Sequence, residues 1–367
     1  MIDAYTLTTD DEEKWRKILP ADFRAGASLE YVRIAERQTG LSARLFVVAD
    51  DGKPLVAYPY FLRPLDTLPF TASVDSTWYD TCTPEYLGPV WLDSDLTPEE
   101  APFRFPEVFS GHCLDHGIIA EFAHLDPWIS DELLEPGCVK PNREIVYVDL
   151  TWPEDEIWMK SLSSDARRQT KQGHRAGVQT RRATSPDDVR EFYRLYAMTM
   201  ERLQAREGYW YPLEYFMAFF ETMSDNSFFV LAEYEGQVVA GGLFLHDDRE
   251  IRWHLSAADR EWSRVRPVNV YLYNTIRESL GQKWTRMILG GAYADGDGVF
   301  RFKANFSRLR AAFNTYERVH DTEACAELMT HWHRFHDGAS PPDDYFPAYR
   351  SSPGASDDQA AVEADTA

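Results

Sequence analysis

Two segments of the chain repeat one pattern, and this repeat restricts the fold more than any other feature of the sequence. Residues 45–62 (LFVVADDGKPLVAYPYFL) align without a gap with residues 228–245 (FFVLAEYEGQVVAGGLFL), although their turn glycines fall one residue out of step; Phe46 then matches Phe229. Each segment predicts a strand, a tight polar turn and a second strand. A helical stretch containing Leu-Glu-Tyr precedes each hairpin. The chain is therefore expected to hold two copies of one mixed α/β domain.

The second copy predicts its elements most clearly, because its apolar residues alternate between helical and strand periodicity. The expected elements are helices over 187–203, 212–223 and 269–284, and strands over 228–234, 237–245, 250–256 and 286–291. Two helices, an antiparallel meander, a helix and a strand follow one another in this order in the GNAT acyltransferase fold. We therefore predict an α/β (α+β) protein of two tandem GNAT-like acyltransferase domains, each a mixed, mostly antiparallel sheet flanked by helices.

The domain boundaries follow from the length of the chain and from its composition. The 367 residues are too many for one ordinary domain and suit two. We expect a degenerate GNAT-like domain over residues 1–155 and a GNAT-like catalytic domain over residues 156–350. Residues 351–367 are small, polar and acidic, so we expect a disordered tail there.

Charge and cysteine content limit the partners and the compartment. With 38 Lys and Arg against 60 Asp and Glu, the net charge is −22, which argues against a broad electrostatic contact with nucleic acid or an anionic membrane. The sequence contains no apolar stretch long enough to span a bilayer. Its acidic N-terminus lacks the regions of a signal peptide, and its four cysteines have no disulfide-like or metal-like spacing. We therefore expect a cytoplasmic protein with reduced thiols.

Several stretches together resemble the Fem-type aminoacyltransferases, tandem-GNAT enzymes related to those that build peptidoglycan cross-bridges. WYDTCTPEYLGPV (78–90) is similar to that family's Asp…Thr-Pro-Tyr-Gly-Tyr-Gly-Pro segment, and residues 158–178 are similar to its Arg- and Lys-rich inter-domain helix. WHLSAAD (253–259) and LGG (289–291) match common strand ends. GVFRFKANFS (298–307) matches the family's Gly…Phe-Lys…Phe-Gly motif, with serine in place of the last glycine.

The resemblance implies a reaction, a co-substrate and a class of acceptor. Family members transfer an amino acid from aminoacyl-tRNA to an amine and so form an amide. By this resemblance the co-substrate is aminoacyl-tRNA, no cofactor is required, and the acceptor is a small-molecule or peptidyl amine. A peptidoglycan precursor and a peptide-antibiotic intermediate are both compatible with the sequence. We expect a monomer without a membrane span.

Lys303 is the residue to which the resemblance assigns catalysis. The ester of an aminoacyl-tRNA is already activated, so the enzyme must align the amine with the carbonyl and stabilise the oxyanion of the tetrahedral intermediate. A protonated lysine between Phe302 and Phe306 suits that second task. The alternative is a solvated lysine on an amphipathic stretch. Asp295 and Asp297 are expected to shape the loop before Lys303.

Further residues are expected to contact the substrates or to shape their cleft. For the segment at 79–86 the alternative is a buried turn with hydrogen-bonded threonines, and for the aromatic loop at 201–212 it is ordinary packing. The expected substrate-binding residues are Tyr79, Asp80, Thr83, Tyr86, Arg202, Tyr209, Tyr211, His254, Tyr271, Gly290, Gly291, Arg301 and Phe302.

A basic cluster stands out from the acidic background of the chain. Clustered guanidinium groups suit phosphate oxygens, whether of a tRNA acceptor stem or of a nucleotide-sugar acceptor. The alternative is a solvated helix that pairs with acidic neighbours. The residues expected to bind tRNA or phosphate are Arg167, Arg168, Lys171, Arg175 and Arg181, with Arg182 beside them.

Two other functions compete with aminoacyl transfer. An N-acyltransferase that uses acyl-CoA or an acyl carrier would need a glycine-rich loop before residues 269–284 to bind pyrophosphate. Arg264 and Arg266 are present there, but the glycines are not, and Pro267 removes a backbone donor. A catalytically silent GNAT pair serving in envelope polysaccharide assembly is the third possibility. No metal site is expected, because HWHRFH (331–336) does not place its first two histidines on one helical face.

Overall fold

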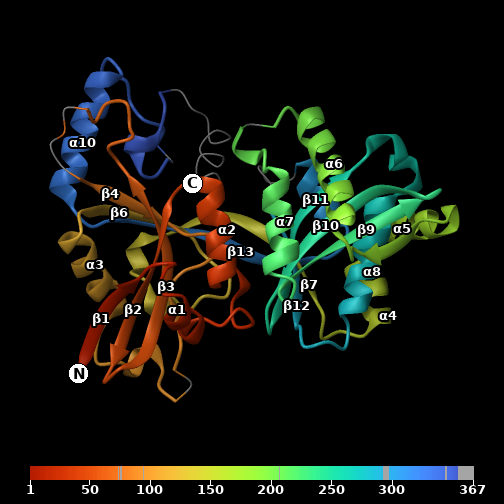
Figure 1. The fold of residues 1–367 in the computed structure, drawn as a ribbon, viewed down its shortest axis with the longest axis horizontal. Coiled ribbons are helices and arrows are strands. Elements are labelled where there is room, and N and C mark those ends of the chain that lie inside the picture. The colour runs from red at the N-terminus through yellow and green to blue at the C-terminus, as the bar shows by residue number, and fades with distance from the viewer. Residues whose placement is uncertain are drawn as a thin grey trace. The chain divides into compact units, whose positions relative to one another are not determined.

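The computed structural model describes residues 1–72, 74, 77–93, 95–205, 207–291, 297–343 and 345–353. The chain divides into two compact units, which Figure 1 shows as ribbons. Unit 1 comprises Met1–Pro20, Gly26–Asn142 and the chain from Ala312 onward, and unit 2 comprises Ala21–Ala25 and Arg143–Ala311. Within the described residues, no helix combines the length and the apolar character needed to cross a bilayer.

The sheet of unit 1 contains one parallel pair of strands among antiparallel neighbours. In spatial order its strands are β1 (Ile2–Leu7), β2 (Ser42–Asp50), β3 (Lys53–Pro64), β4 (Tyr79–Cys82), β6 (Ile118–His124) and β13 (Leu309–Val319), and β5 (Val90–Trp91) pairs with β3. Only β4 and β6 run parallel. Helix α3 (Phe105–Asp115) lies between these two strands in the sequence and provides the crossover that a parallel pair requires.

The helices of unit 1 bury apolar side chains against this sheet. They are α1 (Glu12–Ile18), α2 (Leu29–Thr39), α3 (Phe105–Asp115) and α10 (Thr322–Phe335), with short 3₁₀ turns at Ala25–Ala27, Pro98–Glu100, Asp131–Leu133, Pro136–Cys138 and Ala348–Arg350. Helix α2 begins at Ser28, whose hydroxyl accepts from the Tyr31 N–H, and ends at Gly40 in the left-handed conformation. Phe109 of α3 packs edge-on against Phe46 and Tyr58 of the sheet, with ring centroids 5.1 Å apart in both pairs.

Unit 2 repeats this plan with a parallel pair at the centre of its sheet. Its strands in spatial order are β7 (Val139–Asp149), β12 (Arg286–Gly290), β11 (Glu250–Ala258), β10 (Gln237–His246), β9 (Ser227–Tyr234) and β8 (Gln179–Arg182). Only β11 and β12 run parallel. The helices are α4 (Glu154–Glu156), continued by a wider turn at Ile157–Ser161, then α5 (Ser164–Ala176), α6 (Pro186–Leu203), α7 (Leu213–Thr222), α8 (Pro267–Ser279) and α9 (Gly298–Ala304).

Helices α6 and α8 cover opposite faces of the unit 2 sheet. A Cβ atom at Gly241 would lie 2.9 Å from Phe192 of α6, whereas one at the next residue, Gly242, would lie 3.0 Å from Tyr271 of α8. Since neighbouring residues of a strand point to opposite faces, these contacts place the two helices on the two sides. The observed elements agree with those expected for this copy, and the mixed, mostly antiparallel sheets flanked by helices confirm the predicted fold class.

The hairpins β2–β3 and β9–β10 have the same structure, but their equivalent residues differ by one position from those of the gapless sequence alignment. Both have a two-residue turn with positive φ, at Asp51-Gly52 and at Glu235-Gly236. In both, the third residue of the second strand is bulged, because the pairing skips Leu55 in one hairpin and Val239 in the other. Gly52 therefore corresponds to Gly236, and the match of Phe46 with Phe229 was wrong by one residue. Such a shift moves every side chain to the other face of the strand.

The unit boundaries also differ from those expected at residues 155 and 350. Unit 2 begins at Arg143, because β7 pairs with β12 (Asp149 opposite Arg286). The chain from residue 312 onward, which the sequence analysis assigned to the catalytic domain, belongs to unit 1, where Thr315 pairs with His124. The expected disordered tail at 351–367 lies outside the described residues from residue 354 onward.

Candidate functional site

The candidate site of unit 2 lies where the parallel strands β11 and β12 stop pairing. Their last paired residues are Arg252 and Ile288, although β11 continues to Ala258. The pairing of β10 with β11 skips His254, which is a β-bulge at this position. Bulges redirect side chains and are frequent next to active sites. The end of β12 and the bulged part of β11 therefore form a local opening in the ladder of the sheet.

Lys303 reaches this opening from helix α9. The helix begins at Asp297, whose carboxylate accepts from the Phe300 N–H at 2.7 Å and so caps it. The loop that Asp295 and Asp297 are expected to shape lies outside the described residues over 292–296. The half-buried Lys303 ammonium donates to the Gly291 carbonyl at 2.5 Å. Burial lowers the pKa of Lys303 to about 8, against an opposing effect of Asp297. This lysine is not the solvated surface charge of the alternative reading.

The glycine pair at the end of β12 makes room for the ammonium. Gly290 has φ +80°, and a Cβ atom there would lie 3.2 Å from the Lys303 Nζ atom. At Gly291 a Cβ atom would lie 3.1 Å from the Glu144 carbonyl oxygen of β7. A side chain at the first position would therefore meet both a strained backbone and the lysine.

An aromatic wall surrounds the Lys303 side chain. The Nζ atom lies 6.0 Å from the ring centroid of Trp253, and the Phe302 ring packs against Trp253 at 6.2 Å. Tyr271 lies beneath Trp253, fully buried, with its hydroxyl 2.6 Å from the Ser256 hydroxyl. Burial raises the pKa of Tyr271. Tyr271, which is predicted to contact substrate, supports Trp253 from below, and Trp253 itself is not among the predicted site residues.

His254 and the aromatic loop form a second cluster on the other face of the sheet. The His254 ring nitrogen Nε2 lies 3.0 Å from the Tyr215 hydroxyl, and the Tyr215 ring stacks on Tyr211 at 4.3 Å. The Tyr209 carbonyl accepts from the Tyr196 hydroxyl. Arg202 and Arg301 are exposed. His254 and the tyrosines of this cluster thus lie on the opposite face of the sheet from Trp253 and Lys303, whereas Arg301 belongs to α9 with Lys303.

The four site residues expected in the first copy lie in unit 1, and Asp80 has a structural role there. Asp80 is fully buried and accepts from Arg63 at 2.7 Å, from Arg350 at 2.7 Å and from the Tyr349 hydroxyl at 2.9 Å. Both carboxylate oxygens have partners, so Asp80 cannot bind a substrate without breaking a buried ion cluster. A substrate-binding role for Asp80 stays a prediction, and it would require this ion cluster to open.

The neighbours of Asp80 form the buried turn that was the alternative to a substrate-binding segment. The Thr83 hydroxyl accepts from the His124 N–H at 3.2 Å. Tyr86 packs edge-on against Phe313 with ring centroids 4.8 Å apart. Tyr79 is the first residue of β4 and is half-buried. Each of these contacts holds the segment in place within unit 1.

The expected phosphate-binding residues divide into two groups in the structure. Arg167 donates to three carbonyl oxygens, those of Trp158, Met159 and Leu162, at 2.7–3.2 Å. It therefore closes the turn before α5. Arg181 belongs to β8 and pairs with Asp188 at 2.6 Å and with Glu233 at 2.7 Å. The hydrogen bond from Arg181 lowers the pKa of Asp188, so Arg181 fits the alternative in which basic residues pair with acidic neighbours.

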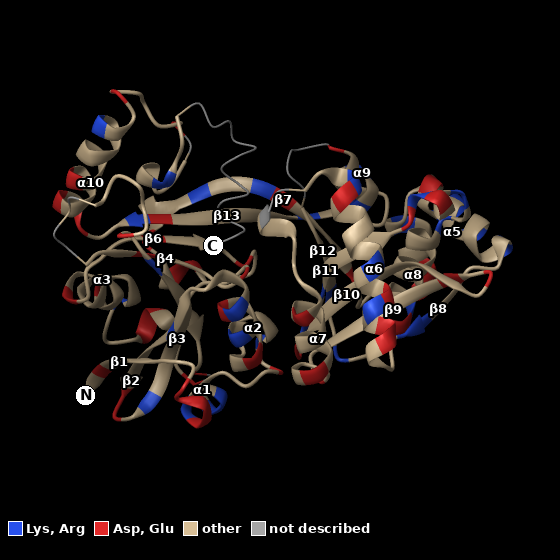
Figure 2. Ribbon diagram, turned by 45° about the horizontal axis from the view of Figure 1, so that its top comes forward, with Lys and Arg blue, Asp and Glu red and all other residues tan. Residues whose placement is uncertain are grey.

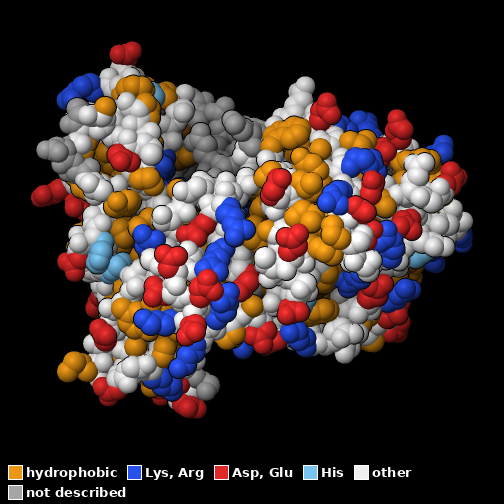
Figure 3. Space-filling model, viewed as in Figure 1, with side chains coloured by type: hydrophobic (Ala, Val, Ile, Leu, Met, Phe, Trp, Pro, Cys, Tyr) orange, Lys and Arg blue, Asp and Glu red, His pale blue; other side chains and the backbone are white. Residues whose placement is uncertain are grey.

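The remaining basic residues are exposed on α5, where Figure 2 shows blue segments. Arg168 forms an exposed ion pair with Asp165 at 2.9 Å. The Lys171 ammonium lies 5.5 Å from the Trp158 ring centroid. Arg175 is exposed in the last turn of the helix. In Figure 3, acidic and basic side chains are interspersed over the visible face, so any polyanion contact has to be local.

The described residues hold no group of three His, Cys, Asp or Glu side chains that could bind a metal ion. His333 of α10 contacts the Ala339 carbonyl through Nδ1 at 2.8 Å, and the neighbouring Trp332 is buried in unit 1. Helix α10 therefore packs into the fold through Trp332, and HWHRFH is the sequence of an amphipathic helix.

The sequence and the fold of this chain were compared with those of known proteins. Residues 160–304 match the family model described as the acetyltransferase (GNAT) domain, whereas no curated protein matches the chain. The crystal structure of FemX superposes with a TM-score of 0.64 at 12% identity, over 89% of this chain and 99% of FemX. L-PGS from Bacillus licheniformis gives a TM-score of 0.55 at 13% identity, over 87% of this chain and 95% of its own.

A third structure is described as the C-terminal domain of a lysylphosphatidylglycerol synthetase from Agrobacterium fabrum. It gives a TM-score of 0.54 at 15% identity, over 88% of this chain and 95% of its own. At these identities the three structures establish the fold. Together with the domain match they support a transferase of the acyltransferase class. The chain therefore has the fold of FemX, and its residues 160–304 match the acetyltransferase (GNAT) domain.

Proposed function

We propose that this protein is an aminoacyltransferase that uses Lys303 to stabilise the transition state of amide formation. The donor is an aminoacyl-tRNA, and the acceptor is the amine of a small molecule or a peptide. The amine nitrogen attacks the ester carbonyl, the amide bond forms, and the ester bond to the tRNA 3′-terminal ribose oxygen breaks. The amine loses a proton, and the ribose oxygen gains one.

The observation that carries the proposal is the placement of the Lys303 ammonium. Among the described residues the Gly291 carbonyl uses one of the three donor positions of this ammonium, and we assign the other two to an oxyanion. Burial disfavours the isolated charge, as the lowered pKa of about 8 reflects. A developing oxyanion would compensate that charge in a poorly solvated environment, where such interactions are strongest. At pH 7 the lysine would still be mainly protonated.

The start of helix α8 supports a donor other than acyl-CoA. Arg266, in the left-handed conformation, precedes Pro267 at the first helical position, so this position offers no N–H to a phosphate. Gly173 of α5 packs directly on this turn, because a Cβ atom there would lie 2.8 Å from the Val265 carbonyl oxygen. The Gln172 amide donates to the Arg264 carbonyl at 2.9 Å. Helix α5 thus covers the surface at which a helix N-terminus would bind a pyrophosphate.

The test compares donors on the same protein. Aminoacyl-tRNA charged with labelled amino acids is mixed with a panel of amines, and labelled amide is separated from tRNA-bound label. We expect amide formation by the wild type with at least one charged amino acid. Acetyl-CoA should bind weakly in calorimetry and should acetylate none of the same amines. Micromolar binding of acetyl-CoA with thiol release would instead support the acyl-CoA-dependent N-acyltransferase.

A further inference from the structure

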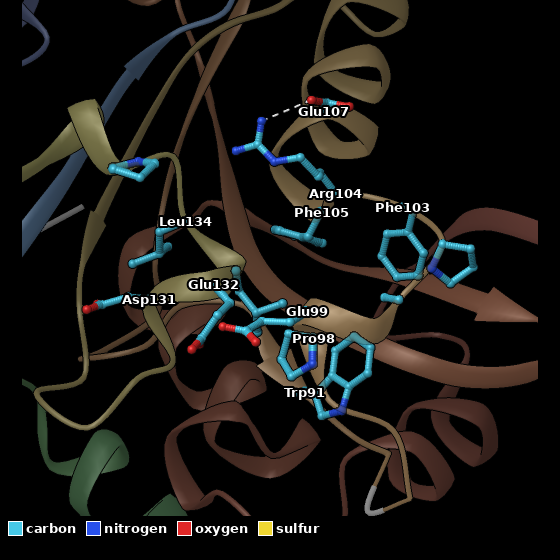
Figure 4. A pocket seen from close by; sticks show the side chains of 14 residues that line it. Trp91, Pro98, Glu99, Phe103, Arg104, Phe105, Glu107, Asp131, Glu132 and Leu134 are labelled. Carbon is cyan, nitrogen blue, oxygen red and sulfur yellow. Dashed lines mark hydrogen bonds and ion pairs between the residues drawn. The ribbon is translucent and has the colours of Figure 1, made fainter.

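Unit 1 contains a cavity of about 660 Å³ that takes no part in the chemistry assigned to unit 2. It lies between Trp91 of β5, the 3₁₀ turn Pro98–Glu100, the start of α3 and the 3₁₀ turn Asp131–Leu133 (Figure 4). Pockets of roughly 300–1,000 Å³ are typical of small-molecule sites. The size of the cavity therefore suits a small organic ligand, and the lining residues determine which kind.

Two aromatic rings form one side of the cavity. Trp91 and Phe103 are half-buried, and their ring centroids lie 6.4 Å apart at an angle of 31°. The Trp91 indole N–H donates to the Leu96 carbonyl at 2.7 Å, which fixes the orientation of the ring. Rings held in this way present π faces to a ligand, and π faces attract cations as well as apolar groups.

Carboxylates form the opposite side. Glu99, Asp131 and Glu132 are exposed residues of the two 3₁₀ turns, which pack beside each other. Among the described residues, Glu99 and Asp131 have no ion-pair partner. Glu132 accepts from the Ser130 hydroxyl, and this hydrogen bond lowers the pKa of the carboxyl group. These carboxylates give this part of the lining a negative potential that favours a cation.

The one basic residue of the lining does not provide that compensation. Arg104 points to Glu107 in Figure 4, with an N–O distance of 3.0 Å, and it also pairs with Glu135 at 3.2 Å. The cavity therefore keeps an excess of negative charge on its Glu99 and Glu132 side. This excess opposes the weak preference for anions that the N-terminus of α3 would create.

A metal ion does not fit these residues. The described residues include no group of three His, Cys, Asp or Glu side chains that could hold one. Carboxylates on one side and aromatic rings on the other instead match a ligand with a positive head and an apolar or planar body. We propose that this cavity binds an organic cation, an alkylammonium or guanidinium group, between Glu99 and Glu132 on one side and Trp91 and Phe103 on the other. The proposal is independent of the reaction assigned to Lys303.

The experiment uses the full chain and two defined probes, cadaverine and agmatine. Calorimetry at low ionic strength should give saturable binding of at least one probe, and added sodium chloride should weaken it. Glutarate, which has a similar length and the opposite charge, should not bind. The double variant Glu99→Gln with Glu132→Gln should lose on the order of tenfold or more in affinity. Phe103→Leu, which keeps an apolar side chain, should lose several-fold.

A matched control separates the cavity from the general acidity of the protein. Glu13→Gln with Glu327→Gln removes the same two charges from exposed helical positions of unit 1 that do not line the cavity. This control should retain wild-type affinity. The proposal is overturned if neither probe binds the wild type saturably, or if the control weakens binding as much as the cavity variant does. Should the double glutamate variant fail to fold, unchanged binding by a folded Phe103→Leu protein would overturn it as well.

Discussion

The ammonium nitrogen of Lys303 lies 2.5 Å from the carbonyl oxygen of Gly291, twelve residues earlier in the chain. This contact ties the end of helix α9 to the residue that follows β12. Gly290, beside it, has a left-handed backbone and no side chain to obstruct the ammonium. The position of the lysine therefore depends on the glycine pair as well as on its own helix, and substitutions can separate the two.

Gly290→Ala should impair catalysis in addition to destabilising the protein. The left-handed backbone costs a residue with a Cβ atom about 1–2 kcal/mol. The added Cβ would also lie 3.2 Å from the Lys303 Nζ atom and displace it. We expect the turnover of the folded variant to fall roughly tenfold or more, because small displacements of catalytic groups are costly.

Gly281→Ala is the matched control for that substitution. Gly281 has φ +72°, and a Cβ atom there would meet nothing within 4 Å. Thermal unfolding should show similar destabilisation of the two variants, while turnover should fall only in Gly290→Ala. Equal turnover in both variants would indicate that the position of the Lys303 ammonium does not affect the reaction.

The rate of aminoacyl transfer should fall as the pH rises through about 8. Lys303 acts in its protonated form, and burial lowers its pKa to about 8. Above that pH the rate should drop nearly tenfold per pH unit. The arginine of Lys303→Arg stays charged at every pH used. Because the acceptor amine titrates in the same way in both assays, its effect cancels in the ratio of the wild-type rate to the variant rate. A ratio that stays constant between pH 6.5 and 9.5 would contradict this role.

The same pKa shift predicts the direction in which stability changes with pH. The lysine of an unfolded chain has a pKa of about 10.4, so between about pH 8 and 10.4 the unfolded state binds more protons than the folded state. The free energy of unfolding of the wild type should therefore rise with pH across this range, relative to that of Lys303→Met. Chemical denaturation of both proteins at pH 7.5, 9 and 10.5 measures the difference. If the free energy of unfolding of the wild type instead falls with pH relative to that of Lys303→Met, the predicted direction of the pKa shift is contradicted.

The exposed residues of α5 should carry any contact with tRNA. Changing Arg168, Lys171 and Arg175 to glutamate should weaken tRNA binding and flatten its salt dependence, because fewer counterions are released. The melting temperature should change little, since exposed charges contribute little to stability. Arg167→Ala should instead lower the melting temperature, because Arg167 holds three carbonyl groups. Filter binding over a salt series tests both, and an unchanged salt slope in the triple variant would exclude α5 as the tRNA contact.

Asp80→Asn should lower stability through the ion cluster of unit 1. The substitution removes the charge that compensates the buried Arg63 guanidinium. Breaking a buried pair in this way typically costs about 3–5 kcal/mol. Asp66→Asn, at an exposed position of the same unit, is the control and should change stability very little. If Asp80→Asn melts like the wild type but fails to bind the acceptor, Asp80 has the binding role that its buried position argues against.

Most of the fold was predictable because local pattern and tertiary structure agree in unit 2. The helix at residues 187–203 and the hairpin at 228–245 have the periodicity and turn residues that their burial requires. The register of the first hairpin was not predictable from a gapless alignment. Both hairpins have the same turn and the same bulge, so Gly52 is equivalent to Gly236, whereas the gapless alignment matched similar side chains and paired Phe46 with Phe229.

The candidate site was predictable only where a motif keeps its members close in sequence. Lys303, Phe302 and the pair Gly290-Gly291 were expected together and do meet. Trp253 was missed, because it reaches the lysine from a strand fifty residues earlier, and the bulge at His254 decides which side chain faces it. The burial of Asp80 was not predictable, since its partners Tyr349 and Arg350 lie 269 and 270 residues away and have no sequence signal.

Single-turnover transfer from aminoacyl-tRNA by wild type and Lys303→Met, with enzyme in excess over the charged tRNA, tests the central claim most directly. The account predicts that the variant folds, binds aminoacyl-tRNA normally and forms amide roughly 10²–10³ times more slowly, the usual loss for one oxyanion donor. Lys160→Met, at an exposed position paired with Glu156, should react at the wild-type rate. A folded Lys303→Met protein that forms amide at nearly the wild-type rate would contradict the assignment of Lys303 to the transition state.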